Sequence, residues 1–293
     1  MKIKKAVITA AGLGTRVLPA SKAMPKEMIP IVDKPAIQYI VEECVRSGIT
    51  DILIILSRGK HVVEDHFDRS PDLEKRLAKT GKQELLDQMI GIAQMADISY
   101  VRQQEQLGLG HAILCAKNFV GNDPFAVLYG DDVIIGEDPA ISQLCRAYDK
   151  YEKGVVGIKE CAVEDVMKYS SMKVEALGDD CYEISDMIEK PKREQIFSNY
   201  AILGRCVLPP KIFDILEHIP KGANNELQLT DAMKQLAVSE GMIGVDFTGT
   251  RYDMGNKLGI LKAAIEVGLS RPDLGDGLAE FIKAKAAELN QHI

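Results

Sequence analysis

Residues 5–10 (KAVITA) form a short run rich in β-branched side chains, and the run ends at the glycine-rich turn Gly12-Leu13-Gly14. Downstream, residues 35–47 place apolar side chains at helical spacing, and residues 51–56 (DILIIL) are apolar after the first position. A strand, an amphipathic helix and a second, apolar strand are typical of a right-handed βαβ unit in a parallel sheet. This stretch decides the fold class, because it predicts an α/β protein whose ligands bind beyond the carboxyl ends of its strands.

The same alternation continues along the chain. Helices are expected near residues 60–68 and 84–95 and from about residue 110, with strands at 98–102 and 125–129. Four strands separated by turns follow at 154–158, 172–175, 181–188 and 200–207. Helices return at 210–218, 227–239, 254–268 and 273–289, with one more strand at 242–247. The pattern predicts a doubly wound mixed sheet with helices on both faces, which the block 154–207 extends into a second lobe.

Composition limits the class of protein. The chain has 293 residues, of which 46% are hydrophobic and 27% charged, as in an ordinary globular protein of one or two domains. Its longest aliphatic run, residues 52–56, is far too short to span a membrane. The amino terminus has no signal-peptide pattern, so a cytoplasmic location is expected. The six cysteines form no Cys-x-x-Cys pair and the five histidines are scattered, which predicts reduced thiols and no structural zinc.

Charge limits the class of ligand. The net charge of −7 argues against polymeric nucleic acid as a partner. A small phosphorylated ligand remains compatible with it, because a few cations and backbone amides bind one whatever the global charge.

The long connection after the first strand carries two cations beside its glycines. Arg16 follows Gly14 closely, and Lys26 lies further along the same connection. Glycines let the backbone approach a phosphate, and connections of this length tend to be functional. Val17 stands where a dinucleotide fingerprint needs its third glycine, and no Gly-Lys-Ser/Thr of a P-loop follows. The segment therefore predicts an anion site and argues against a Rossmann oxidoreductase.

Further motifs occur in order along the chain: GLGTR (12–16), PKEM (25–28), DKP (33–35), LGLGH (107–111), GDD (130–132), EKP (189–191), ELQLTD (226–231) and RYD (251–253). With them the chain resembles the sugar-1-phosphate nucleotidyltransferases, and among these the bacterial UTP–glucose-1-phosphate uridylyltransferases, over residues 4–268. The resemblance implies a Rossmann-like domain over 1–268, with a nucleotide-binding half at about 1–135 and a sugar-binding half at about 136–268. A helical tail over 269–293 follows.

The resemblance also implies a reaction. UTP and α-D-glucose 1-phosphate would meet over Mg²⁺, and in-line attack on the α-phosphorus would give UDP-glucose and pyrophosphate. Catalysis of this kind rests on positioning and charge neutralisation, without a protein nucleophile. Arg16 and Lys26 are expected to hold the triphosphate, and Lys190 the phosphate of the sugar. Asp131 and Asp253 are expected to bind Mg²⁺, which typically takes one or two carboxylates together with substrate phosphates.

Other expected contacts follow from the same resemblance. The nucleotide-binding residues would be Ala11, Gly12, Gly14 and Glu27 in the first loop, with Gln103 and Gly108 at the base. On the sugar side stand Glu189, Lys190 and Ser170, the last in a position where the family usually has glycine. An exposed carboxylate is the simple alternative for Glu27, and a surface ion pair for Glu189-Lys190.

Four polar residues within the motifs are left outside the predicted site. Asp132 either supports the metal site from behind or caps a helix. Thr230 and Asp231 are interpreted as helix caps, and His111 as an ordinary core or surface histidine.

Two other functions remain open. A thymidylyltransferase would also fit Gln103, because its amide suits either pyrimidine. A non-catalytic paralogue that binds sugar nucleotides and regulates a partner is the second, although intact Arg16, Lys26, Asp131 and Asp253 argue against it. The resemblance suggests a homodimer or homotetramer, with the helical tail as a contact.

Overall fold

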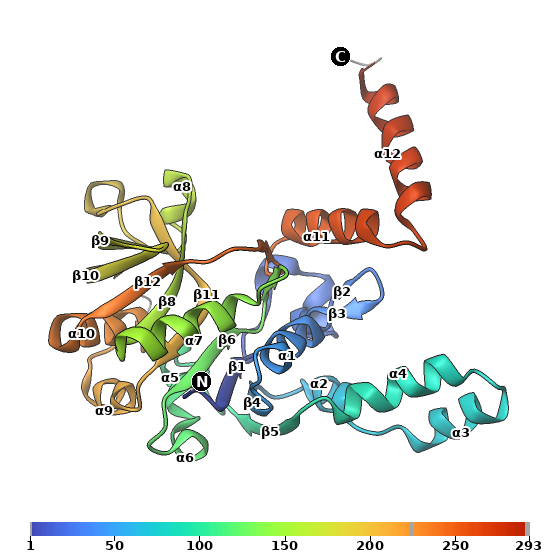
Figure 1. Ribbon diagram of the computed structural model, residues 1–293, viewed down its shortest axis with the longest axis horizontal. Helices are drawn as coiled ribbons and strands as arrows, with labels where there is room; N and C mark the ends of the chain where they lie inside the picture. The colour runs from blue at the N-terminus through green and yellow to red at the C-terminus, as the bar shows by residue number, and fades with distance from the viewer. Residues whose placement is uncertain (1, 223–224, 291–293) are drawn as a thin grey trace.

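The structure is a computed structural model that describes residues 2–222 and 225–290 (Figure 1). Its centre is a nine-stranded sheet of order β5-β4-β1-β6-β11-β8-β12-β10-β9. These strands are β5 (Asp97–Arg102), β4 (Asp51–Leu56), β1 (Lys5–Thr9), β6 (Phe125–Tyr129), β11 (Tyr200–Leu208), β8 (Gly154–Glu160), β12 (Met242–Asp246), β10 (Cys181–Glu189) and β9 (Ser170–Gly178). All run in one direction except β10 and β11. The predicted mixed α/β sheet is therefore confirmed.

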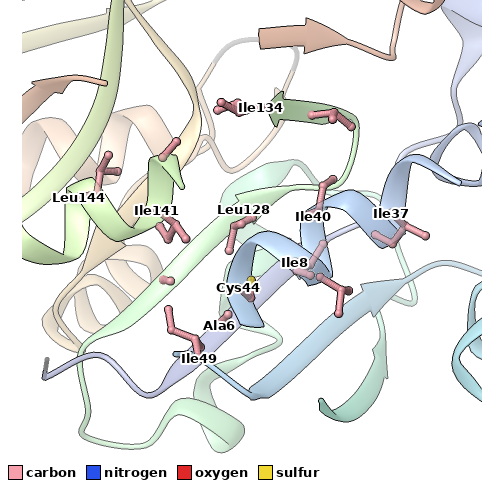
Figure 2. Packing of buried hydrophobic residues seen from close by; sticks show 14 of the residues in the cluster. Ala6, Ile8, Ile37, Ile40, Cys44, Ile49, Leu128, Ile134, Ile141 and Leu144 are labelled. Atoms are coloured by element: carbon pink, nitrogen blue, oxygen red, sulfur yellow. The ribbon is translucent and has the colours of Figure 1, made fainter. Parts of the chain in front are cut away.

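Helices cover both faces of the sheet. One face carries α1 (Ala36–Arg46), α2 (His61–Phe67), α4 (Gln83–Gln94) and α7 (Ala140–Tyr151), and the other carries α5 (Leu109–Leu114), α9 (Lys211–His218) and α10 (Leu229–Glu240). Successive side chains of β1 show why, since Ile8 packs in the core beneath α1 and Val7 packs in the core on the other face. Figure 2 shows the first of these cores, with Ile37 and Ile40 of α1 above the sheet.

The elements expected from the sequence are present, with ends shifted by a few residues. Those not expected are α3 (Pro71–Lys79), α6 (Lys117–Val120), α7, α8 (Val163–Val166) and the pairs β2 (Pro30–Ile31) with β3 (Lys34–Pro35) and β7 (Asp132–Ile135) with β13 (Thr250–Asp253). The β7–β13 pair brings Asp132 opposite Asp253, although they are distant in sequence.

The long first connection is built from short helical turns. Residues Thr15–Val17, Ala20–Lys22 and Lys26–Met28 form 3₁₀ turns before the β2–β3 hairpin. Val17 and Glu27 are buried within it, so the segment packs onto the domain. This arrangement carries Arg16 and Lys26 to the carboxyl ends of β1 and β6.

The carboxyl-terminal part is helical. Helix α11 (Lys257–Ser270) lies on the body, and α12 (Gly275–Asn290) projects away from it (Figure 1). The helix expected at 273–289 is therefore present, while residues 291–293 of the predicted tail lie outside the described residues. None of the described helices is both long enough and apolar enough to cross a membrane. All six cysteines are free thiols, and Cys44, Cys145, Cys181 and Cys206 are buried.

Candidate active site

Three cavities meet around Tyr129, the last residue of β6. The largest, about 380 Å³, is lined by Thr9, Ala11, Gly12, Leu13, Lys26, Gln103, Gln106, Gly108, Leu109, Ala112, Tyr129, Asp131 and Glu226. A second, about 160 Å³, is lined by Arg16, Tyr129, Asp131, Asp132, Tyr169, Ile202, Arg251 and Asp253. A third, about 90 Å³, is lined by Leu109, Tyr129, Lys168, Tyr169, Ser170, Glu189, Ile202, Gln228 and Thr230. The structure thus gathers most of the predicted nucleotide, metal and sugar residues at one end of the sheet.

The glycine-rich loop presents its backbone to the largest cavity. Ala11 and Gly12 line this cavity, as expected. Gly14 does not line it and acts on the loop itself, because its φ of 68° lies in the left-handed region that favours glycine. The Gly14 carbonyl accepts a 2.7 Å hydrogen bond from Ser21 Oγ, which ties the loop to the next turn.

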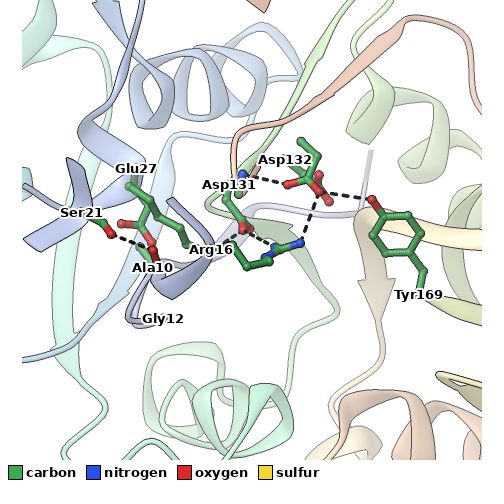
Figure 3. Close-up of polar contacts among 12 residues, drawn as sticks. Ala10, Gly12, Arg16, Ser21, Glu27, Asp131, Asp132 and Tyr169 are labelled. Atoms are coloured by element: carbon green, nitrogen blue, oxygen red, sulfur yellow. Dashed lines mark hydrogen bonds and ion pairs between the residues drawn. The ribbon is translucent and has the colours of Figure 1, made fainter. Parts of the chain in front are cut away.

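Two cations and two carboxylates meet between the first and second cavities. Lys26 forms an ion pair and hydrogen bond with Asp131. Arg16 Nη2 lies 3.8 Å from Asp131 Oδ2, and its Nη1 lies 3.6 Å from Asp253 Oδ2. Figure 3 shows Arg16 beside Asp131 in this group. Because the Arg16 side chain is 61% exposed, it is free to follow a phosphate that enters.

The two carboxylates fit a divalent cation. A Cβ atom placed on Gly255 would lie 2.8 Å from both Asp131 Oδ2 and Asp253 Oδ1, and 2.5 Å from Arg16 Nη2. Gly255 therefore leaves open a space that is bordered by the carboxylates of Asp131 and Asp253. The guanidinium group of Arg16 also lies beside this space. The described residues contain no cluster of three or more acidic, histidine or cysteine side chains with metal-binding geometry. Two carboxylates suit Mg²⁺, which completes its coordination with phosphates and water.

The charges around these carboxylates separate their pKa values. Burial opposes ionisation of Asp131, but Lys26 and Arg16 outweigh it and hold the pKa of Asp131 below its ordinary value. Burial also opposes the charge on Lys26, yet Asp131 and Glu27 raise the Lys26 pKa. In contrast, burial and the neighbouring Asp131 raise the pKa of Asp132 to about 6. At neutral pH, Asp131 is thus a carboxylate and Lys26 an ammonium.

Asp132 supports the site from behind. It begins β7 rather than a helix, which excludes the capping role. Its Oδ1 lies 2.5 Å from Arg251 Nη2, and the Arg251 guanidinium lies 4.9 Å from the centre of the Tyr169 ring. The Tyr169 hydroxyl in turn donates to Asp253 Oδ2 at 3.2 Å. This chain of contacts orients Asp253.

Gln103 and Gly108, the residues expected to contact the base, both line the largest cavity. Nε2 of Gln103 lies 3.0 Å from the carbonyl of Gly108 and 3.0 Å from Nδ1 of His111. A carbonyl can only accept, so this nitrogen must be the amide donor, and Oε1 remains as an acceptor for a ligand. Gly108 has a φ of 103°, and a Cβ there would lie 2.7 Å from the carbonyl oxygen of Leu227, so only glycine fits.

The third cavity is lined by two of the three predicted sugar residues, Glu189 and Ser170. Thr230 Oγ1 donates to Glu189 Oε2 at 2.8 Å. Burial raises the pKa of Glu189, although this hydrogen bond lowers it in part. Ser170 lines the cavity, but its Oγ accepts from the backbone N–H of Ile202 at 3.0 Å. Lys190 is half-exposed with Nζ 4.0 Å from Glu189 Oε1, and it lines none of the three cavities.

The placement of Glu27 differs from the prediction. Its side chain is 0% exposed and does not line the largest of the three cavities. Its two carboxylate oxygens accept from Lys60 Nζ at 2.9 and 2.8 Å. The exposed-carboxylate alternative is wrong, and the Glu27 side chain does not face the cavity, because the carboxylate lies beneath the loop with its counter-ion.

Sequence reasoning missed several residues that complete the site. Each contacts another residue of the site or its loop. These residues are Lys60, which binds the Ala10 carbonyl, His111 beside Gln103, Thr230 beside Glu189, and Arg251 beside Asp132. His111, Thr230 and Arg251 lie inside the quoted motifs, which was the only signal available for them. Lys60 lies in none of the motifs.

Comparison with known proteins agrees with this geometry. Residues 5–268 match the family described as Nucleotidyl transferase. The chain is 52% identical to UTP–glucose-1-phosphate uridylyltransferase YngB of Bacillus subtilis (strain 168), over 96% of this chain and 95% of that protein.

Solved structures agree as well. A crystal structure of UDP-glucose pyrophosphorylase complexed with UDP-glucose is similar with a TM-score of 0.84 and 43% identity, covering 92% of this chain and 100% of that one. A UTP-bound UGPase from Acinetobacter baumannii is similar with a TM-score of 0.88 and 38% identity, covering 96% of this chain and 98% of that one. The chain therefore belongs to the nucleotidyl transferase family and, within it, to the UTP–glucose-1-phosphate uridylyltransferases.

Proposed function

We propose that the protein transfers the uridylyl group of UTP to α-D-glucose 1-phosphate, giving UDP-glucose and pyrophosphate. The observation that carries the proposal is the meeting of Arg16 and Lys26 with Asp131 and Asp253 between the largest cavity, which we assign to the nucleotide, and the second cavity. The named activity of the Bacillus subtilis relative, at 52% identity, supports the same reaction.

The reaction needs charge control more than proton transfer. An oxygen of the sugar phosphate forms a bond to the α-phosphorus of UTP, and the bond from that phosphorus to the bridging oxygen of pyrophosphate breaks. The leaving group takes the electron pair. Lys26 and Arg16, which face carboxylates in the free protein, would turn to the phosphates and neutralise the charge that builds there. Lys190 would approach the phosphate of the sugar.

Asp131 and Asp253 would hold Mg²⁺. The chemistry that the ion supplies when bound is neutralisation of phosphate charge and polarisation of the α-phosphoryl group. The chain's own contribution is to keep Asp131 ionised through Lys26 and to orient Asp253 through Tyr169.

Recognition of the two substrates is divided between the cavities. Oε1 of Gln103 would accept from N3–H of uracil, beside the backbone of Gly108. Glu189, steadied by Thr230, would accept from hydroxyls of the hexose, with Ser170 at the rim. This division assigns the nucleotide to the half at about 1–135 and the sugar to the half at about 136–268.

The test is a pyrophosphate-release assay that crosses UTP, dTTP, ATP and GTP with glucose, galactose and mannose 1-phosphates. We expect the highest kcat/KM for UTP with glucose 1-phosphate. A preference for dTTP would establish the thymidylyltransferase instead, which Gln103 permits because thymine carries the same N3–H. Binding of UDP-glucose without turnover of any pair would identify the regulatory paralogue.

The protein would act as a homodimer or homotetramer. Helix α11 exposes large apolar side chains at Leu258, Leu261, Ile265 and Leu269. A row of this kind marks an interaction surface, and a second copy of the chain is the partner that the resemblance suggests. The cytoplasmic location expected from the sequence stays a prediction.

A further inference from the structure

We propose that Lys60 and Glu27 form a positioning pair that sets the backbone amides of the glycine-rich loop for the triphosphate. Lys60 lies just before α2, and its Nζ donates to the carbonyl oxygens of Ala10 at 2.5 Å and Gly12 at 2.7 Å. The same Nζ lies 2.9 and 2.8 Å from the two oxygens of Glu27. One ammonium thus holds the loop from beneath, and one carboxylate holds the ammonium.

The effect on the loop follows from peptide geometry. In a trans peptide the C=O of one residue and the N–H of the next point in opposite directions. With the carbonyls of Ala10 and Gly12 turned to Lys60, the N–H groups of Ala11 and Leu13 point the opposite way. Ala11, Gly12 and Leu13 line the nucleotide cavity.

A contact on the cavity side supports this alternation. The carbonyl between the two anchored ones, that of Ala11, accepts from Gln106 Nε2 at 3.0 Å, and Gln106 itself lines the cavity. Within the described part of the chain, the amides of Ala11 and Leu13 make no hydrogen bond. They remain available to an anion such as a nucleotide phosphate.

The pair also connects the loop to Lys26. Glu27 follows Lys26 in the same 3₁₀ turn, so anchoring Glu27 beneath the loop fixes the backbone from which Lys26 reaches Asp131. Lys60 therefore acts on two groups that the proposed reaction uses, the loop amides and the Lys26 ammonium.

The burial of the pair sets the design of the test. The side chains of Lys60 and Glu27 are 8% and 0% exposed. Removing only Lys60 would leave a buried carboxylate without its counter-ion, which is strongly destabilising. The double variant Lys60→Met/Glu27→Gln removes both charges, keeps the shape of the Glu27 side chain and shortens that of Lys60 by only one atom, so it separates loss of positioning from loss of the fold.

The experiment measures UTP binding by isothermal titration calorimetry, together with KM for each substrate and thermal unfolding. The double variant should unfold cooperatively and bind UTP about tenfold or more weakly, since lost orientation of a few donors has this size of effect. Its KM for glucose 1-phosphate should stay near that of the wild type. Glu27→Gln alone should weaken UTP binding less, because Lys60 keeps both carbonyls. Lys60→Arg should recover part of the loss.

A control is the more exposed Lys153–Glu183 pair, whose Nζ and Oε1 lie 3.0 Å apart; Lys153 precedes β8, Glu183 lies on β10, and neither lines the three cavities. Lys153→Met/Glu183→Gln should leave the Kd for UTP unchanged. The inference is overturned if the Lys60/Glu27 double variant binds UTP as tightly as the wild type, or if it weakens both substrates equally, as loss of folded protein would. The inference rests on the proposed function only for the identity of the ligand. Failure of the wild type itself to bind UTP would contradict that function instead.

Discussion

The hydroxyl of Ser170 completes a hydrogen bond that the sheet cannot make. β6 pairs with β11 only over residues 205–208, so Ile202 lies beyond that pairing, and its N–H donates to Ser170 Oγ. Ser170 has no left-handed backbone conformation, so a serine in place of the family's glycine causes no backbone strain there. Ser170 therefore has two separate roles: its hydrogen bond stabilises the fold, and its position at the cavity rim shapes the cavity.

We predict that Ser170→Gly alters both stability and sugar preference. Leaving the N–H of Ile202 unpaired should lower the free energy of unfolding by about 1–3 kcal/mol. Removing the Cβ and hydroxyl from the rim should change the kcat/KM ratios among glucose, galactose and mannose 1-phosphates by about tenfold. Ser171→Ala is the control, because Ser171 is buried and hydrogen-bonded but does not line the cavity. Unchanged sugar ratios in Ser170→Gly would leave Ser170 a purely structural residue.

Asp131 and Asp253 are predicted to be essential for turnover. Asp131→Asn or Asp253→Asn should lower kcat by orders of magnitude, because a neutral amide is a poor ligand for Mg²⁺. Affinity for UTP should fall much less, since Lys26 loses a competing partner when Asp131 is neutralised. Far-UV circular dichroism should show an intact fold, and the exposed Asp123→Asn serves as control. Wild-type activity in excess EDTA would contradict the metal role.

Single residues show where prediction from the sequence ends. Arg16, Lys26 and Asp131 could be placed because they follow strands whose carboxyl ends must meet. Lys60 could not, because its role depends on acceptor atoms of three residues that the tertiary fold brings together. Glu27 shows the converse, since a charged residue in a polar loop gives no sign that it will be buried.

Among the elements, the segment just before α10 is hydrogen-bonded to residues 107–110, which we call the base loop, and the two form a joint. Leu227 N donates to the carbonyl of Leu107 at 2.7 Å, and Gly110 N donates to the carbonyl of Leu227 at 2.8 Å. The joint closes the nucleotide cavity with Glu226, and it leaves no room for a side chain at Gly108.

We expect Gly108→Ala to weaken UTP binding. The added methyl group would force the base loop and the 226–228 segment apart, and the φ of 103° adds strain. KM for UTP should rise, while KM for glucose 1-phosphate changes less. Gly91→Ala on α4 is the control, because a Cβ there meets nothing within 4 Å. Kinetics of Gly108→Ala that match the wild type would show that this joint does not shape the nucleotide cavity.

The contact between β10 and α10 predicts a pH dependence. Burial raises the pKa of Glu189, so this carboxylate takes up a proton at a higher pH than an ordinary glutamate. As the pH falls through that raised pKa, Glu189 loses its ability to accept from the hexose, and KM for glucose 1-phosphate should rise. Glu189→Gln should remove this part of the dependence and leave only the titration of the sugar phosphate. A parallel rise in KM for UTP would contradict the assignment.

The elements themselves were predictable where one face is apolar. Helix α3 has no buried residue, and its only large apolar side chains, Leu73 and Leu77, are too few to mark a helix in the sequence. Helix α7 differs, because it does have a buried apolar stripe at helical spacing, although the predicted elements did not include it. The stripe consists of Ile141, Leu144, Cys145 and Tyr148. The β7–β13 pair joins segments more than a hundred residues apart, and local pattern carries no information about such pairing.

At the scale of the whole molecule, one continuous sheet joins the two predicted halves. The three cavities lie where β6 ends, next to the antiparallel β11 that links both parts of the sheet. A rigid sheet across this boundary fixes the distance between the nucleotide and sugar cavities, which in-line attack requires. The helices α11 and α12 lie outside this arrangement and are free to serve assembly.

The exposed row on α11 predicts an oligomer that can be disrupted without loss of the active site. Leu258 and Leu261 are 61% and 60% exposed, and Phe281 on the projecting α12 is 59% exposed. Burying such side chains against a second copy would stabilise the assembly by about 1.5–3 kcal/mol for each fully buried one.

Light scattering after size exclusion should therefore give a dimer or tetramer for the wild type and a smaller mass for Leu258→Glu/Leu261→Glu. Leu85→Glu, on an exposed position of α4, should leave the mass unchanged. The double variant should retain its kcat at saturating substrate, because no cavity of the candidate site is lined by α11. A monomeric wild type, or a double variant of unchanged mass, would show that this row does not form the contact.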